Sequence, residues 1–100
     1  MIVVEGTARI PAGKWPTARA AMEPMIRASR AEDGCIDYAY SVDMLDPDRL
    51  RVIELWRNID ALKQHFETPH MATFRKALTA IGPQDLQVRM FDAPPQALPL

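Results

Sequence analysis

Apolar residues alternate with polar ones in three short stretches of this chain, and a fourth stretch is apolar at both phases of the alternation. Alternation with a period of two is typical of a strand that buries one face. The doubly apolar stretch predicts a strand that is covered on both sides. We therefore predict four strands. They cover residues 2–10, 35–43, 51–56 and 85–92.

Between these stretches the apolar residues recur every three or four positions, which predicts helices. The first helix covers residues 15–30, where Pro16 suits the first turn. Pro24 lies in its interior and removes a backbone donor; we expect a kink there rather than a break, since the apolar stripe continues past it. Gly34 is expected to close the helix.

The second helical region is expected to be broken in two. Asn58 is a good N-cap for a short helix over residues 59–66. Pro69 interrupts the pattern and can start a new helix over residues 69–81. Gly82, followed by a proline, ends it.

The predicted order is β-α-β-β-α-β, which is the ferredoxin-like arrangement: an α+β fold with a four-stranded antiparallel sheet and helices on one face. Asp46-Pro47-Asp48 consists of residue types that favour turns, and we expect a hairpin loop longer than a tight turn there. Residues 1–92 form one domain in this prediction. Residues 93–100 contain three prolines and are expected to be an extended tail.

The third strand raises the question of what covers the second sheet face. Ile53 and Leu55 are apolar and fall on the opposite phase from Glu54 and Trp56. If the helices cover one phase, a partner sheet would bury the other. We therefore predict a homodimer with two sheets packed face to face, a sheet-to-sheet dimeric α+β barrel. The tail could cross to the partner.

The composition of the chain argues against several classes of function. Twelve basic and thirteen acidic side chains give a net charge of −1, which argues against nucleic acid and against a polybasic membrane patch. No apolar run approaches the roughly 18 residues of a membrane span, and the N-terminus lacks a signal-peptide pattern. The single cysteine, Cys35, fits a reducing compartment. We expect a cytoplasmic protein.

The candidate chemistry gathers between Glu54 and Phe74. His65 and His70 are the only histidines of the chain, and histidine titrates near neutral pH. His65 is either a general base facing a cavity or a helix residue paired with Glu54. His70 accepts a proton or caps a helix, and Glu54 tunes a histidine or forms a salt bridge. We take His65, His70 and Glu54 as the catalytic candidates.

Several aromatic side chains and two methionines of this chain either form part of the core or line a flat pocket for an aromatic ring. Polar groups near that pocket would hold an anionic substrate. The substrate-binding candidates are Trp56, Phe74, Tyr38, Tyr40, Asn58, Met22 and Met25.

Two histidines and a carboxylate also form a known iron-binding triad. However, five residues on one helix turn through roughly 140°, and Pro69 intervenes between the histidines. Glycine-rich phosphate loops and paired cysteines are absent too. The sequence therefore predicts neither a metal nor another cofactor.

Several short motifs follow one another along the chain: Gly34, Tyr38, Asp46-Pro47, Glu54-x-Trp56, Ala61-Leu62-x-x-His65 and Pro69-His70-x-x-x-Phe74. In this order and at this spacing they resemble the antibiotic biosynthesis monooxygenase (ABM) family of small dimeric α+β barrels, over residues 1 to about 92. The resemblance implies oxidation of quinols, anthrones or related aromatics by dioxygen, in many members without metal or flavin. The family also contains isomerases and haem-degrading enzymes; the places that carry the haem chemistry hold Gly6, His65 and Arg75 here, which argues against it.

Three functions follow as hypotheses. The first is a monooxygenase without a cofactor, acting on a small quinol, phenol or anthrone. The second is an isomerase or proton-transfer enzyme that uses the same histidines on a small carbonyl metabolite without oxygen. The third is a binding module that only sequesters a small molecule.

Overall fold

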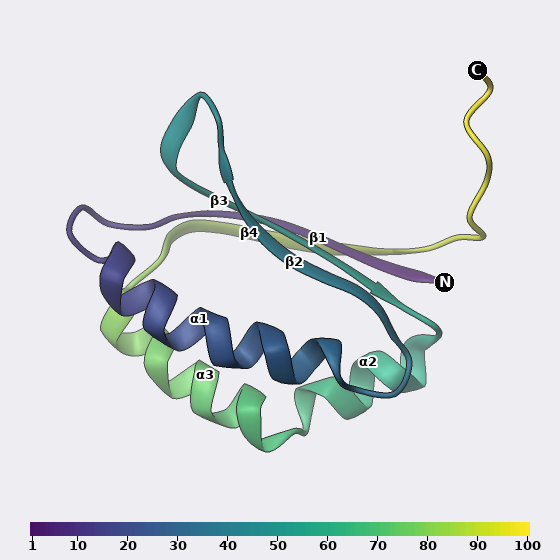
Figure 1. Cartoon of the computed structure of the whole chain (residues 1–100), viewed down its shortest axis with the longest axis horizontal. Coiled ribbons are helices and arrows are strands. Elements are labelled where there is room, and N and C mark those ends of the chain that lie inside the picture. The colour runs from purple at the N-terminus through teal and green to yellow at the C-terminus, as the bar shows by residue number, and fades with distance from the viewer.

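The computed structural model describes residues 1–100 as a sheet covered on one face by a layer of helices (Figure 1). The strand order in the sheet is β2-β3-β1-β4, and every neighbouring pair is antiparallel. This is the ferredoxin-like α+β fold that the sequence predicts. The elements are β1 (Ile2–Arg9), α1 (Trp15–Arg30), β2 (Cys35–Asp43), β3 (Asp46–Trp56), α2 (Ile59–Phe66), α3 (Pro69–Ile81) and β4 (Gln84–Asp92).

The register decides which side chains face the helices. On β1, Val4 lies opposite Glu54 of β3 and Met90 of β4. On β2, Tyr38 lies opposite the same Glu54. Because facing residues of neighbouring strands point to the same side of a sheet, this row shares one face with buried Trp56, two residues further along β3.

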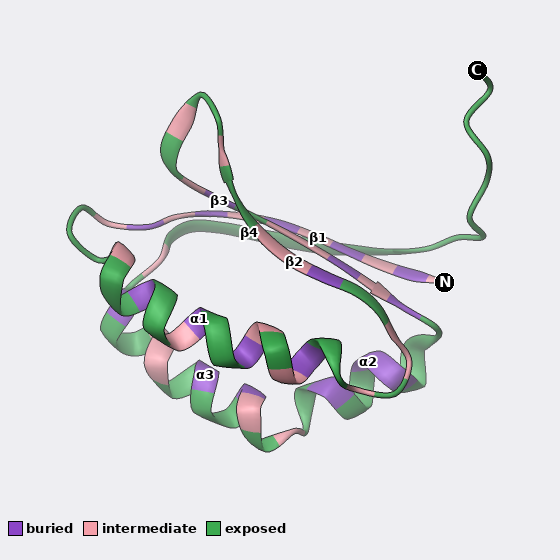
Figure 2. Ribbon diagram, in the orientation of Figure 1, coloured by how far each residue is buried: buried purple, intermediate pink, exposed green.

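The core fills the space between the helices and this sheet face, and the buried segments of each helix lie on its inner side (Figure 2). Apolar side chains from all three helices and from β1, β2 and β3 form one cluster. Its members are Ile2, Val4, Ile10, Ala18, Met22, Met25, Tyr38, Leu50, Trp56, Ala61, Leu62, Met71, Phe74 and Ile81.

The hairpin between β2 and β3 is tighter than the sequence predicts. β2 ends at Asp43 and β3 begins at Asp46, so only Met44 and Leu45 lie between them. The backbone N–H of Leu45 donates to the Asp43 carboxylate, which closes the turn at 2.8 Å. The expectation of a longer loop was wrong, because Asp46 and the following proline belong to the strand.

The break in the second helical region is confirmed. The Asn58 side chain accepts the N–H of Ala61 and starts α2, and the Thr68 hydroxyl accepts the N–H of Met71 and starts α3. Pro69 occupies the first turn of α3, where its missing donor costs nothing. By contrast, α1 runs unbroken through Pro24, as expected.

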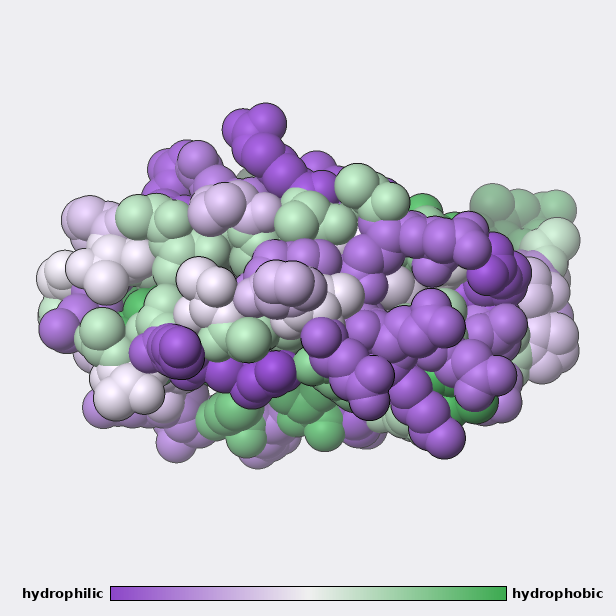
Figure 3. Space-filling view, turned by 90° about the horizontal axis from the view of Figure 1, so that it is seen from below, coloured by the Kyte–Doolittle hydropathy of each residue, from purple (hydrophilic) through white to green (hydrophobic).

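The β4 strand is exposed along its whole length. Leu86, Val88 and Met90 share the phase that faces the helices, yet each side chain is more than half exposed because no helix covers this edge of the sheet. Viewed from the helix side, the surface mixes hydrophilic side chains with smaller hydrophobic patches (Figure 3). None of the three helices has the length and hydrophobicity of a membrane span.

Candidate active site

An apolar cleft of about 170 Å³ opens between the helices and the uncovered edge of the sheet. Its floor is made by the sheet and its walls by α1 and α3. Gly6 has no side chain to fill the cleft: a Cβ atom there would lie 3.2 Å from Val88 Cγ2 and from the Gln87 carbonyl oxygen. The lining residues are Gly6, Thr7, Ala8, Ile10, Met22, Tyr40, Leu50, Val52, Glu54, Phe74, Leu78, Pro83, Leu86 and Val88.

Glu54 is the one ionisable carboxylate in this cleft wall, and only 7% of it is exposed. The indole N–H of Trp56 donates to its Oε1 at 3.0 Å, since residues two apart on a strand lie on the same face. Burial raises the pKa of Glu54, and the hydrogen bond from Trp56 opposes this rise. A carboxylate with a raised pKa is a stronger proton acceptor than one in water.

Two tyrosines stand beside Glu54 on the neighbouring strand. Their rings stack with centroids 5.7 Å apart, and their hydroxyl oxygens lie 3.5 Å apart. Tyr40 reaches the cleft and meets the Phe74 ring edge-on at 6.3 Å, whereas Tyr38 is fully buried. Burial raises the pKa of Tyr40 to about 12, so its hydroxyl stays protonated and can donate a hydrogen bond to an anion.

A second hollow of about 490 Å³ adjoins the cleft and lies between α1 and the strands β2 and β3. Both are lined by Met22, Tyr40 and Leu50, so these side chains form the partition between them. Methionine is flexible and polarisable, which suits a wall that adapts to a bound ring. The mouth of the second hollow carries Arg19 and Glu23, which form an exposed ion pair at 3.1 Å.

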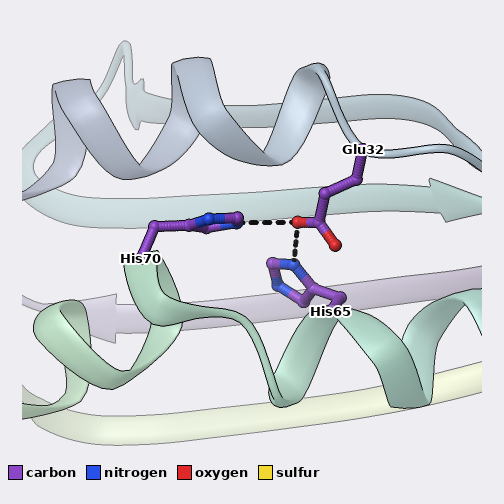
Figure 4. A group of neighbouring side chains, drawn as sticks. All are labelled: Glu32, His65 and His70. Atoms are coloured by element: carbon purple, nitrogen blue, oxygen red, sulfur yellow. Dashed lines mark hydrogen bonds and ion pairs between the residues drawn. The ribbon is translucent and has the colours of Figure 1, made fainter.

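The histidines belong to a separate cluster around Glu32 (Figure 4). His65 Nδ1 lies 2.6 Å from Glu32 Oε2, and His70 Nε2 lies 2.8 Å from the same oxygen. Glu32 follows the end of α1, while the histidines come from the end of α2 and the start of α3. The cluster therefore joins three helices where α2 and α3 separate.

His65 is completely buried, and its ring lies 4.6 Å from the Trp56 ring, centroid to centroid. Burial lowers its pKa, and the hydrogen bond with Glu32 opposes this. A neutral ring donates through Nδ1 to Glu32, which leaves Nε2 as a buried acceptor without a partner. The cluster thus contacts Trp56, whose indole N–H donates to Glu54 in the cleft wall.

The structure does not bring all the predicted site residues together. Glu54, Tyr40, Phe74 and Met22 line the cleft. The side chain of Asn58 is occupied as the N-cap of α2. The remaining candidates are core or belong to the Glu32 cluster: Trp56, Tyr38, Met25, His65 and His70.

Sequence reasoning missed Glu32; of its two alternatives for His65, a base facing a cavity or a residue paired with Glu54, the second named the wrong carboxylate. Glu54 instead accepts the Trp56 N–H, and Glu32 takes both imidazoles. Glu32 lies 33 and 38 residues from its partners, so no local pattern marks it. Its position two residues before Gly34, in the turn that closes the first helix, was the available signal.

Comparison with known proteins defines the class. Residues 1–77 match the model of the antibiotic biosynthesis monooxygenase family. A crystal structure from Deinococcus radiodurans, itself provisionally assigned as an antibiotic biosynthesis monooxygenase, superposes with a TM-score of 0.90 at 26% identity. It covers 100% of this chain and 99% of that one.

The chain belongs to the antibiotic biosynthesis monooxygenase family. The uncharacterized protein sll1783 of Synechocystis is 36% identical over 73% of this chain and 50% of its own length. The probable quinol monooxygenase YgiN of Escherichia coli is 36% identical over 47% of this chain and 53% of its own. The chain thus spans about half the length of the curated relatives it matches.

Proposed function

We propose that this protein is a monooxygenase that oxidises a small quinol, phenol or anthrone-like substrate with dioxygen and needs no cofactor. The observation that carries the proposal is Glu54, a buried carboxylate on the wall of an apolar cleft. A site of this kind takes an apolar ring and offers its hydroxyl one proton acceptor. The similarity to a probable quinol monooxygenase supports the same substrate class.

The first step is removal of a proton. A substrate ring lies against Phe74 and Met22 with its hydroxyl directed at Glu54, which takes the proton as general base. Tyr40 remains neutral and donates a hydrogen bond to the substrate oxygen, which stabilises the anion. The apolar surroundings exclude water, so the anion is a better electron donor than in solution.

The second step is electron transfer to oxygen. The substrate anion gives one electron to dioxygen, and the two radicals combine by forming a bond between carbon and oxygen. The O–O bond of the peroxide then breaks, and one oxygen leaves as water. A quinol and one dioxygen together contain the atoms and electrons of a hydroxyquinone and one water, so no external reductant is required.

The histidines have a different role in this proposal from the one expected from the sequence. Neither His65 nor His70 is among the residues that line the cleft. His65 supports Trp56, which in turn orients Glu54. We therefore assign the base to Glu54 and treat His65 as a positioning residue.

The test is oxygen uptake by protein treated with a chelator, with a panel of quinols and anthrones, in wild type and Glu54→Gln. Glutamine keeps an oxygen that accepts the Trp56 N–H but cannot take the substrate proton. Loss of a general base lowers kcat by about 10²–10⁴-fold. Catalase is added in parallel, because simple autoxidation reduces dioxygen to hydrogen peroxide, from which catalase releases half of the consumed oxygen. A monooxygenase leaves no hydrogen peroxide, so catalase should not change its oxygen uptake.

Asp60→Asn, an exposed carboxylate at the start of α2, is the matched control and should leave uptake unchanged. Equal activity in wild type and Glu54→Gln would contradict the assignment of the base. Turnover of substrate without oxygen would instead identify an isomerase. Binding of the substrate without any product would identify a sequestering module.

The proposal includes a homodimer built from two sheets. Val3, Ile53 and Leu55 lie on the face away from the helices and remain only half-buried in one chain, beside Phe91, which is 46% exposed. A second sheet would cover this apolar area. Residues 93–100, outside the 1–92 domain, are exposed and extend away from the body, as a segment reaching a partner would (Figure 1).

Sedimentation measures this dimer. Wild-type protein should sediment as a dimer and Leu55→Lys as a monomer, whereas Ile59→Lys, on the helix layer, should remain a dimer. Wild-type protein that sediments as a monomer contradicts the dimer. A cytoplasmic location completes the proposal, because the single Cys35 is a free thiol and suits a reducing compartment.

A further inference from the structure

We propose that Glu32, His65 and His70 form a binding site for a divalent transition-metal ion that joins α1, α2 and α3. The three ligand atoms, one oxygen and two ring nitrogens, lie within 4.8 Å of one another. In Figure 4 both rings direct a nitrogen at the same carboxylate oxygen, and they approach it from different sides. Two imidazoles and one carboxylate are the ligand set of many zinc and non-haem iron sites.

The break between the helices makes this arrangement possible. Five residues apart on one straight helix, the two rings would point in directions roughly 140° apart. His65 instead lies on α2 and His70 on α3, and the chain changes direction between them. The spacing argument against a metal therefore does not apply to this structure.

The geometry also defines how an ion fits. Zinc-to-nitrogen bonds are about 2.0–2.1 Å long. Both nitrogens already aim at Glu32 Oε2 from 2.6 and 2.8 Å, so an ion on these lines takes nearly the present position of that oxygen. Glu32 then withdraws by roughly 2 Å to become the third ligand. Its side chain is long and 13% exposed, so this movement is open to it.

Solvent can supply the remaining ligands. His70 is 21% exposed and Glu32 is 13% exposed, while His65 is fully buried and anchors the inner side. None of the three residues lines the cleft, so the ion does not meet the substrate. It acts instead by fixing His65, whose ring contacts Trp56, the hydrogen-bond donor to Glu54.

The experiment is a titration of chelator-treated full-length protein with Co²⁺, followed by visible absorption. A second readout is Trp56 fluorescence in a Trp15→Phe background, because Trp56 is then the only tryptophan and lies against His65. We expect saturation at one ion per chain, a visible ligand-field band and quenching of Trp56. Zn²⁺ should compete for the site and raise the melting temperature.

Glu32→Gln and His70→Asn each remove one partly exposed ligand and should weaken binding at least about tenfold. Glu67→Gln, an exposed carboxylate at the end of α2, and Cys35→Ser are controls that should bind as wild type does. Far-UV circular dichroism verifies folding of each variant. The proposal is overturned by absence of a Co²⁺ band in wild type, or by equal binding in the two ligand variants. Neither result depends on oxygen uptake, so the site and the proposed activity are tested separately.

Discussion

Gly34 is predicted to be indispensable for joining the turn at Glu32 to α2. Its φ is +87°, a conformation that favours glycine, and a Cβ atom there would lie 2.7 Å from the Cβ atom of Ala61. Real Cβ atoms do not approach so closely, so Gly34→Ala forces β2 and α2 apart. This is the junction that brings Glu32 to His65.

The expected magnitude has two parts. A left-handed conformation costs an L-residue about 1–2 kcal/mol. Overpacking against Ala61 costs about 1–3 kcal/mol more. Gly34→Ala should therefore lower the free energy of unfolding by about 2–5 kcal/mol, which for a domain of this size is a fall in Tm of about 10–30 °C.

A double-mutant cycle with Ala61→Gly separates the two parts, measured by urea unfolding of all four proteins. Removing the Ala61 methyl group relieves the contact but not the backbone cost. In that background Gly34→Ala should cost only about 1–2 kcal/mol. The reasoning is refuted if the substitution costs the same in both backgrounds, or if it costs nothing in the wild type.

Three further predictions concern the cleft and its surroundings. Since burial raises the folded-state pKa of Glu54, its contribution to stability is greatest at low pH and is lost as the pH rises through that pKa. In urea unfolding, Glu54→Gln should therefore gain stability relative to wild type as the pH rises above about 4, the ordinary range of a glutamate; the opposite trend would be inconsistent with a raised pKa. Asn58→Ala should lower the free energy of unfolding by about 1 kcal/mol, because α2 loses its N-cap. It should leave kcat unchanged, and a fall in kcat would favour a substrate-binding role for Asn58. Gly6→Val fills the cleft floor beside Val88 and should raise KM at least about tenfold, whereas an unchanged KM would locate substrate binding elsewhere.

Much of the fold could be predicted because its signals are local. Alternation marked the strands, and Asn58 and Pro69 marked the ends of the helices with their own backbone chemistry. The hairpin was misjudged because Asp46 and the residues after it have turn composition, yet Asp46 pairs with Asp43 across the two-residue turn. The residue composition of the segment does not reveal that Asp43 and Asp46 pair.

The candidate site was predictable only in part, since its contacts join distant segments. Glu54 and Trp56 were placed on one face correctly, because residues two apart on a strand must share it. The partner of His65 depends on how α1 ends relative to α2, which is a matter of tertiary packing. Reactive residue types near one another in sequence thus separated into a cleft wall and a cluster of their own.

The most direct test of the central claim is a crystal structure with a quinol bound under anaerobic conditions. We predict the ring in the cleft beside Phe74, with one hydroxyl within hydrogen-bond distance of Glu54 and Tyr40. A quinol bound at His70 and Glu32, with the cleft empty, would contradict the account.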